Sequence, residues 1–157
     1  MLRYLLGAGV LVTVYLTMPL DGERWWLALI VSLVVLVGIV PFAYRRVTTV
    51  ESSESPVMAA AQAILTVAGM VVFAFSSLYV VVNRRGGEMV GLNTRLDSIY
   101  FTVTTLVTVG YGDIHATGQL ARGVVTAQMV FDVSLLAMSV RLLSNAARKR
   151  VEARDSV

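Results

Sequence analysis

The sequence contains no cysteine and a single histidine, His115. Disulfides and thiolate metal sites are therefore excluded, and one imidazole cannot form a histidine cluster for metal binding or catalysis. Charge is also scarce, because 15% of the 157 residues are charged, whereas an ordinary soluble domain carries roughly 25%. Hydrophobic residues make up 57% of the chain. This composition indicates a membrane protein.

Other function classes are excluded by what the sequence does not contain. We find no nucleophile–base pair, no metal-ligating cluster and no phosphate-binding loop, so we expect neither an enzyme nor a resident cofactor. The formal net charge of +3 is modest, and the basic residues are scattered apart from a short run near the C-terminus. We expect no nucleic-acid binding, because basic ends of membrane proteins usually lie among cytoplasmic headgroups.

Four long and nearly uncharged runs are present, at residues 4–20, 25–44, 57–83 and 123–140. A hydrocarbon core about 30 Å thick requires about 20 helical residues. Each run is long enough, or nearly so, to cross a bilayer. The runs predict four transmembrane helices, at about residues 3–20, 25–45, 57–83 and 120–147.

A fifth uncharged run, residues 98–112, is too short and too rich in threonine to cross as a helix. Non-helical backbone at membrane depth is tolerated only when it is buried in protein or lines a water-filled path. We therefore predict a re-entrant pore helix over residues 97–107. Extended backbone over residues 108–113 would then return to the surface from which the helix entered.

These elements predict four segments along the chain. They are an N-terminal helix pair at 1–50, a cytoplasmic linker at 51–56, a pore domain at 57–147 and a basic cytoplasmic tail at 148–157. The distribution of arginine and lysine in the loops favours a multi-pass protein of the cell membrane with both termini in the cytoplasm. The first two runs carry no internal charge, so we do not expect them to form a voltage sensor.

The hexapeptide TVGYGD, residues 108–113, has a composition suited to ion conduction. An ion that crosses a protein must exchange its hydration oxygens for others at little net cost, and rings of backbone carbonyls can supply them. Carbonyls of an ordinary strand alternate sides, and turning them to one side requires residues with positive φ. Gly110 and Gly112, spaced by two, adopt positive φ without steric penalty. Thr108 can add its hydroxyl at the inner mouth.

Residues 97–113, DSIYFTVTTLVTVGYGD, resemble the pore helix and filter of the potassium-channel family, whose signature is TVGYGD. The resemblance covers about residues 57–143 and leaves residues 1–50 outside. It implies that K+, the permeant ion and bound metal, is coordinated by Thr108, Val109, Gly110 and Tyr111. It implies filter support from Gly112, Asp113, Tyr100 and Phe101. Each chain has one filter segment, so the resemblance also implies a homotetramer around a fourfold axis.

The aromatic pair behind the filter departs from the pattern of many family members. Tyr100 and Phe101 stand where such relatives have two tryptophans. Tyr100 can still donate a hydrogen bond to Asp113, but Phe101 cannot donate to the hydroxyl of Tyr111. One hypothesis is a less firmly braced filter that inactivates or loses selectivity readily. The alternative is that both aromatic side chains simply pack.

Asp132 falls where the family's inner helix commonly has a hinge glycine, and it is the one charge inside the fourth run. Mid-span carboxylates usually face a bundle interior or water. A ring of four could concentrate cations and bind Mg²⁺ or polyamines, as an acidic cavity residue does in inward rectifiers. The alternative is a structural hydrogen bond to Gln128 or a neighbouring helix. Further cavity or gating candidates, on or near the same helical stripe, are Gln128, Leu136, Ser139 and Arg141.

Two other side chains have competing interpretations. Arg141 could line the inner mouth of a pore, or it could extend to the lipid headgroups as arginines at span ends often do. His115 follows the filter on the outer side and could make the outer mouth sensitive to protons. It could equally be an exposed loop histidine.

The sequence thus predicts an all-α membrane protein with four transmembrane helices, a re-entrant pore helix and an extended selectivity filter, assembled as a homotetramer. The predicted function is passive, potassium-selective conduction, with membrane lipids as partners and Ba²⁺ as a blocker. Two alternatives remain open: a non-selective cation channel, and a non-conducting membrane subunit that retains the filter sequence.

Overall fold

A computed structural model describes residues 25–51 and 56–155 of the chain. The helix expected at about residues 3–20 lies outside these ranges. The elements, in order, are α2 (Trp25–Glu51), α3 (Pro56–Gly86), β1 (Met89–Val90), α4 (Arg95–Leu106), β2 (His115–Ala116) and α5 (Gln119–Asp155).

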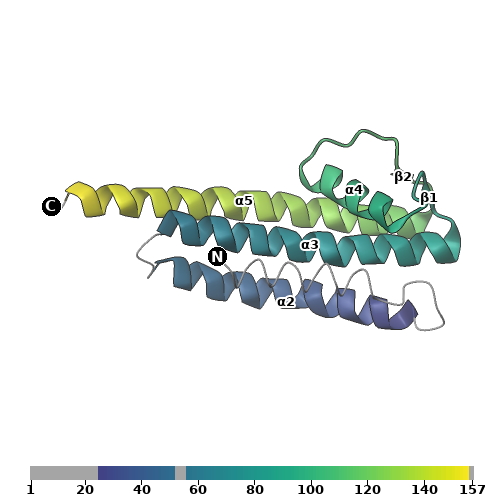
Figure 1. The fold of residues 1–157 in the computed structure, drawn as a ribbon, viewed down its shortest axis with the longest axis horizontal. Coiled ribbons are helices and arrows are strands. Elements are labelled where there is room, and N and C mark those ends of the chain that lie inside the picture. The colour runs from purple at the N-terminus through teal and green to yellow at the C-terminus, as the bar shows by residue number, and fades with distance from the viewer. Residues whose placement is uncertain (1–24, 52–55, 156–157) are drawn as a thin grey trace.

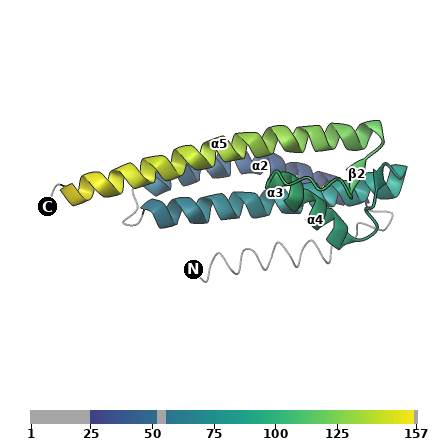
Figure 2. The same cartoon turned by 90° about the horizontal axis from the view of Figure 1, so that it is seen from above.

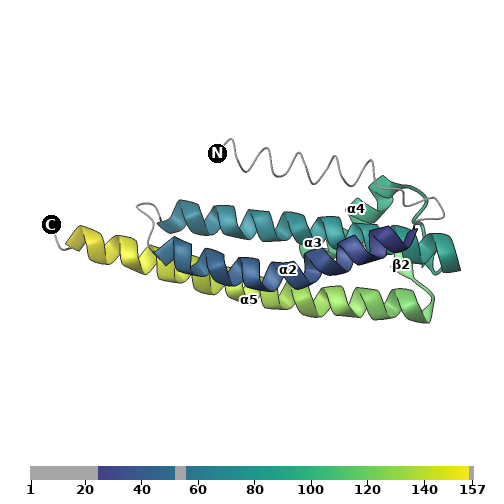
Figure 3. The same cartoon turned by 90° about the horizontal axis from the view of Figure 1, so that it is seen from below.

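The three long helices lie alongside one another, and the short helix α4 and both strands gather at one end of the bundle (Figure 1). Helix α3 packs against both α2 and α5, whereas α2 and α5 touch only slightly. Views from above and below show α5 extending past the other long helices at its C-terminal end (Figures 2 and 3). Helix α3 is therefore the shared support of the described fold.

Two of the described helices are long and apolar enough to cross a membrane, over Val57–Gly86 in α3 and Gln119–Arg148 in α5. They flank the short helix α4, so this part of the predicted architecture is confirmed. Among the described side chains of α2, an apolar stretch covers Trp26–Ile39. Helix α5 continues to Asp155, beyond the expected end at 147, because no proline or glycine interrupts the tail.

Burial differs sharply between the two spans. In the most apolar part of α3, 56% of the residues are buried inside the chain, against 17% in α5. One face of α3 packs on α5, where Phe75 and Phe131 bring their ring centroids within 6.4 Å. Another face holds Phe73, Val80 and Val81 against Ala28 of α2. Helix α5 therefore leaves most of its apolar surface uncovered by its own chain.

The far ends of α3 and α5 meet through small side chains. Ala60 of α3 and Ala146 of α5 are both buried in a cluster with three partly buried neighbours, Val57, Ala59 and Leu142. Small side chains at a contact between apolar helices let the two backbones approach closely.

The near ends of α3 and α5 are joined by Glu88, which lies just after α3. Its Oε2 accepts a hydrogen bond from the backbone N–H of Ala121 at 2.8 Å, and its backbone oxygen accepts from the N–H of Thr117 at 2.8 Å. The carboxylate thus satisfies a free N–H in the first turn of α5. Gly118 leaves room for it, because a Cβ at that position would overlap the Glu88 side chain.

Replacing Glu88 tests this long-range cap. We expect Glu88→Ala to lower stability by about 1 kcal/mol, the usual cost of losing an N-cap oxygen. Glu88→Gln is the matched control, because its amide oxygen can still accept the hydrogen bond. The measurement is the melting temperature of the purified protein in detergent. Equal melting temperatures for Glu88→Ala and the wild type would contradict the assignment.

Helix α4 begins with a reciprocal cap between Thr94 and Asp97. The backbone N–H of Asp97 donates to Thr94 Oγ1 at 3.1 Å, and Asp97 Oδ2 accepts from the N–H groups of Thr94 at 2.7 Å and Asn93 at 2.9 Å. Such a capping box satisfies donors that the first helical turn leaves free. These backbone hydrogen bonds, from Thr94 first and then Asn93, lower the pKa of the Asp97 carboxyl.

The lowered pKa of Asp97 predicts a pH-dependent stability. A carboxyl with a depressed folded-state pKa adds stability above its unfolded pKa, about 4, and loses it as the pH falls through the folded value. We therefore expect Asp97→Asn to destabilise the protein at neutral pH, and the difference from wild type to shrink below about pH 4. Thermal melts of both proteins between neutral and acidic pH measure it. A difference that stays constant on acidification would refute the prediction.

Candidate ion-conduction site

The segment that follows α4 has an alternating backbone conformation. Thr108, Gly110 and Gly112 have φ values of 60°, 55° and 83°. The two glycines adopt this left-handed region without penalty, but a β-branched residue does so only under strain. Thr108 is the sole non-glycine residue with positive φ in the described part of the chain. A strained threonine in regular alternation with two glycines makes this segment the candidate functional site.

The C-terminal end of α4 holds the backbone N–H groups of this segment. The carbonyl oxygen of Thr104 accepts hydrogen bonds from the N–H of Val109 at 2.9 Å and of Gly110 at 3.3 Å, and that of Thr105 accepts from Thr108 at 2.9 Å. These bonds use carbonyls that a helix end leaves free. The position of α4 therefore sets the position of residues 108–110.

Tyr100 braces the outer part of the segment. Its hydroxyl donates the expected hydrogen bond to Asp113 Oδ2, at 2.9 Å. Its ring stacks on that of Tyr111, with centroids 6.3 Å apart and planes inclined by 2°. The hydrogen bond to Asp113 raises the pKa of the Tyr100 hydroxyl, so the phenol remains a donor throughout the physiological pH range.

Phe101 points away from Tyr111 and toward α3. Its ring is buried and makes an edge-to-face contact with Tyr79 of α3, with centroids 5.0 Å apart. Within one chain it therefore packs in the core. This geometry corresponds to the packing alternative considered for Phe101.

Residues 108–113, the candidate conduction segment, are uncovered on one side. Val109 is 50% exposed and Tyr111 is 71% exposed. The apolar side chains of the adjoining face of α4 are also exposed: Leu96, Val103 and Val107. A single chain therefore leaves these side chains uncovered.

Asp132 and Gln128 lie in the interior of the chain, where α5 meets α3 and α4. Asp132 is 5% exposed and Gln128 is fully buried. The side-chain nitrogen of Gln128 donates to Asp132 Oδ2 at 3.0 Å. This arrangement is the structural alternative considered for Asp132.

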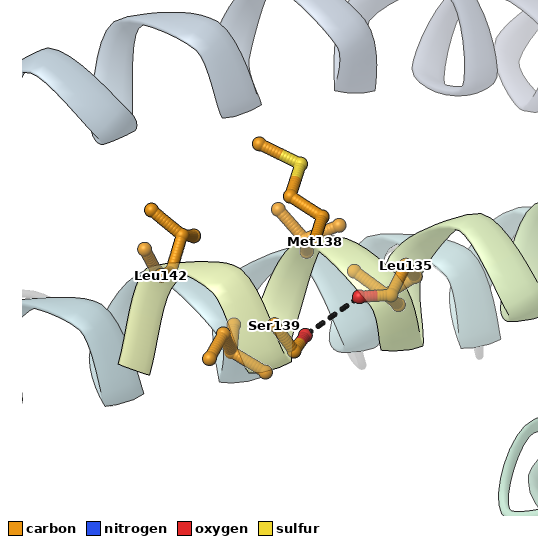
Figure 4. Close-up of a pocket in the computed structure, with 7 residues that line it drawn as sticks. Leu135, Met138, Ser139 and Leu142 are labelled. Atoms are coloured by element: carbon orange, nitrogen blue, oxygen red, sulfur yellow. Dashed lines mark hydrogen bonds between the residues drawn. The ribbon is translucent and has the colours of Figure 1, made fainter. Parts of the chain in front are cut away.

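The other candidates on α5 lie on different faces. Leu136 is exposed, and so is Arg141. Ser139 is partly buried and lines a small hollow of about 20 Å³ between α3 and α5. Its hydroxyl donates to the backbone oxygen of Leu135 at 2.7 Å, within its own helix (Figure 4). The remaining lining is apolar and includes Met138 and Leu142, so the hollow contains no site for a cation.

His115 is exposed and lies close to the C-terminal end of residues 108–113. Its Nδ1 is 3.2 Å from the backbone oxygen of Gly112. At this distance the ring nitrogen donates a hydrogen bond when it carries a proton. The histidine is thus in contact with the segment rather than isolated in a loop.

Some contributors to the site are difficult to identify from their residue types. Threonine disfavours the left-handed conformation that Thr108 adopts, and no local sequence pattern predicts it. Tyr79 bonds to Gln128, 49 residues further along the chain. The cap of α4 did leave a signal, because Thr94 and Asp97 have the spacing of a capping box.

Comparisons with known proteins agree with this geometry. A protein-family model described as "Ion channel" matches residues 62–149, more than half of the chain. The potassium channel AKT2/3 of Arabidopsis thaliana is 34% identical over 64 residues, which cover 38% of this chain and 8% of that protein. The chain thus spans a small part of this relative's length. No solved structure matches significantly. Residues 62–149 contain α4, the segment at 108–113 and most of both spans. The chain therefore belongs to the ion-channel family, and it is a membrane protein and not an enzyme.

Proposed function

We propose that this chain forms a potassium-selective channel in which four copies place residues 108–113 around a common axis. The observation that carries the proposal is the left-handed backbone at Thr108, Gly110 and Gly112. In an extended strand, successive carbonyls point to opposite sides. Alternating left-handed residues turn them to one side, where they can replace the water around an ion.

The coordinating oxygens would come from Thr108, Val109, Gly110 and Tyr111. Because Thr104 holds the N–H groups of Val109 and Gly110 from behind, their carbonyls remain free to face the axis. Gly112, Asp113, Tyr100 and Phe101 would support the filter from outside. K+ is the permeant ion and moves passively down its electrochemical gradient.

The open side of the site supports assembly from several copies. Irregular backbone at membrane depth needs protein or a water-filled path around it, and one chain leaves Val109 and Tyr111 exposed. Each copy contributes one filter segment, so a closed ring of carbonyls requires neighbouring copies. Helix α5 offers an uncovered apolar face for the contacts between copies, which includes Met129, Val133, Leu136 and Val140.

The membrane arrangement follows from the two spans. Helices α3 and α5 would be the outer and inner helices of a pore domain at 57–147, with the filter opening outward and both termini in the cytoplasm. Helix α2 covers a face of α3 and exposes Ile30, Leu33, Val34 and Val37. We assign it as a further span at the periphery, where these side chains face lipid.

Ion flux into liposomes tests the proposed selectivity. We expect purified protein to take up K+ under a potassium gradient, with Ba²⁺ blocking the uptake and Na+ failing to replace K+. Liposomes without protein are the control. Equal uptake of K+ and Na+ would instead establish a non-selective cation channel. The contact of Phe101 with Tyr79 rather than with Tyr111 favours this second candidate, because Phe101 then does not brace Tyr111.

Gly110→Ala tests the backbone mechanism. A non-glycine residue in the left-handed region costs roughly 1–2 kcal/mol per copy, so we expect K+ flux to fall by about tenfold or more. Gly69→Ala is the matched control, because Gly69 lies within α3 and a Cβ there meets nothing within 4 Å. Unchanged K+ flux in Gly110→Ala would contradict the role of this residue.

The assembly makes a separate prediction. Mass measurement of the detergent-solubilised protein, after subtraction of bound detergent, should give four times the 17.0 kDa of one chain. Chemical cross-linking should give a ladder that ends at the fourth band. A single species of one or two chains that still conducts K+ would refute the tetramer.

A further inference from the structure

A cluster of buried polar side chains lies where α3, α4 and α5 meet. Its members are Ser76, Tyr79, Thr102, Gln128 and Asp132. In hydrocarbon surroundings a polar side chain is tolerated when it finds partners within the protein. Five polar side chains gathered beside the pore helix indicate a specific role there.

Gln128 is the centre of this cluster and uses both ends of its side-chain amide. Its Oε1 accepts from the hydroxyl of Tyr79 at 2.6 Å. Its Nε2 donates to the backbone oxygen of Thr102 at 3.1 Å and to Asp132 Oδ2 at 3.0 Å. A flipped amide would face two acceptors with an oxygen. Tyr79 and Asp132 therefore fix the amide so that its nitrogen points at α4.

Thr102 links this amide to the conduction segment. A backbone carbonyl has two lone pairs, so it can accept from Gln128 as well as from its own helix. Two residues later, the carbonyl of Thr104 holds the N–H groups of Val109 and Gly110. On the other side, Ser76 Oγ of α3 donates to Thr102 Oγ1 at 3.1 Å. Movement of Gln128 away from Thr102 would thus release one of the two anchors of α4.

We infer that Gln128 is a positioning residue for ion selection, oriented by Tyr79 and Asp132 and acting through the pore helix on the filter. This inference rests on the proposed function. Gln128 holds α4 from the side of α5 by a hydrogen bond, whereas Phe101 cannot form a hydrogen bond that braces the filter. This role also gives Asp132 a purpose as a hydrogen-bond acceptor, in place of a cavity charge.

The geometry of Asp132 separates these two purposes. Only Oδ2 of the carboxylate is bonded, and Oδ1 has no partner among the described residues. One acceptor oxygen is therefore sufficient for orienting Gln128. Asp132→Asn keeps such an oxygen and removes the charge, whereas Asp132→Leu has a similar size and removes both.

The test is the reversal potential of the reconstituted full chain in planar bilayers with K+ on one side and Na+ on the other. We expect Gln128→Met, Tyr79→Phe and Asp132→Leu each to lower the K+/Na+ permeability ratio by about tenfold, the size of one lost buried hydrogen bond. Asp132→Asn should restore the ratio to within about twofold of wild type, because the acceptor is retained. Gln62→Met is the matched control, because Gln62 lies near the start of α3, away from α4.

The outcomes are distinct. A wild-type protein that does not prefer K+ overturns the proposed function, and this inference with it. A selective wild type whose Gln128→Met and Tyr79→Phe variants are equally selective overturns the inference alone. Loss of selectivity in Asp132→Asn equal to that in Asp132→Leu assigns the effect to charge and overturns the role given to Asp132. Tyr79→Phe keeps the ring against Phe101 and removes only the hydroxyl. It therefore tests the inference if the Gln128→Met variant does not assemble.

Discussion

The fold depends on one constraint on the backbone after α4: its N–H groups must find hydrogen-bond acceptors within the protein. Lipid offers no hydrogen bonds, so the protein must supply these partners itself. The last turn of α4 does so, because Thr104 and Thr105 accept the N–H groups of Thr108, Val109 and Gly110. Helix α4, 12 residues long, therefore supports residues 108–110, which belong to the filter of the proposed channel. This explains why so many contacts converge on α4, from its cap at Thr94 to the buried amide at its side.

Helix α3 carries most of these contacts. It is buried on the faces that meet α2, α4 and α5, and it supplies both an aromatic ring and a hydroxyl to the region behind α4. Large rings fill the space between α3 and α5, where Phe75 meets Phe131. The hydrogen bonds by which Ser76, Tyr79 and Gln128 join α3, α4 and α5 lie at the level of α4. The packing is thus apolar where helices only need to adhere and polar where one backbone must be held in one place.

The sequence predicts some of this and leaves the rest open, for physical reasons. Helices α3 and α5 follow from uncharged runs of span length, and the glycines at 110 and 112 follow from the need for positive φ. Thr108 adopts the same conformation against its own preference, so its type gives no indication. The face of α5 that carries Asp132 depends on which side of the helix meets α3. A stripe of residues defines a face but not its neighbour, which is why the sequence alone does not associate Tyr79 with Gln128. The described residues do not include the first predicted helix, so that helix stays a prediction.

The contacts that hold α5 change in kind along the helix. Near its start, the first turn of α5 donates a hydrogen bond to Glu88, and Gln128 bonds to Tyr79 of α3 and to Thr102 of α4. At the far end the contact is apolar, with Ala60 and Ala146 buried among their partly buried neighbours. The hydrogen bonds that join α5 to the rest of the described fold are thus concentrated in its first part. A small rotation of a rigid α5 about that part would displace its distant end, beyond Ala146, by a much larger distance.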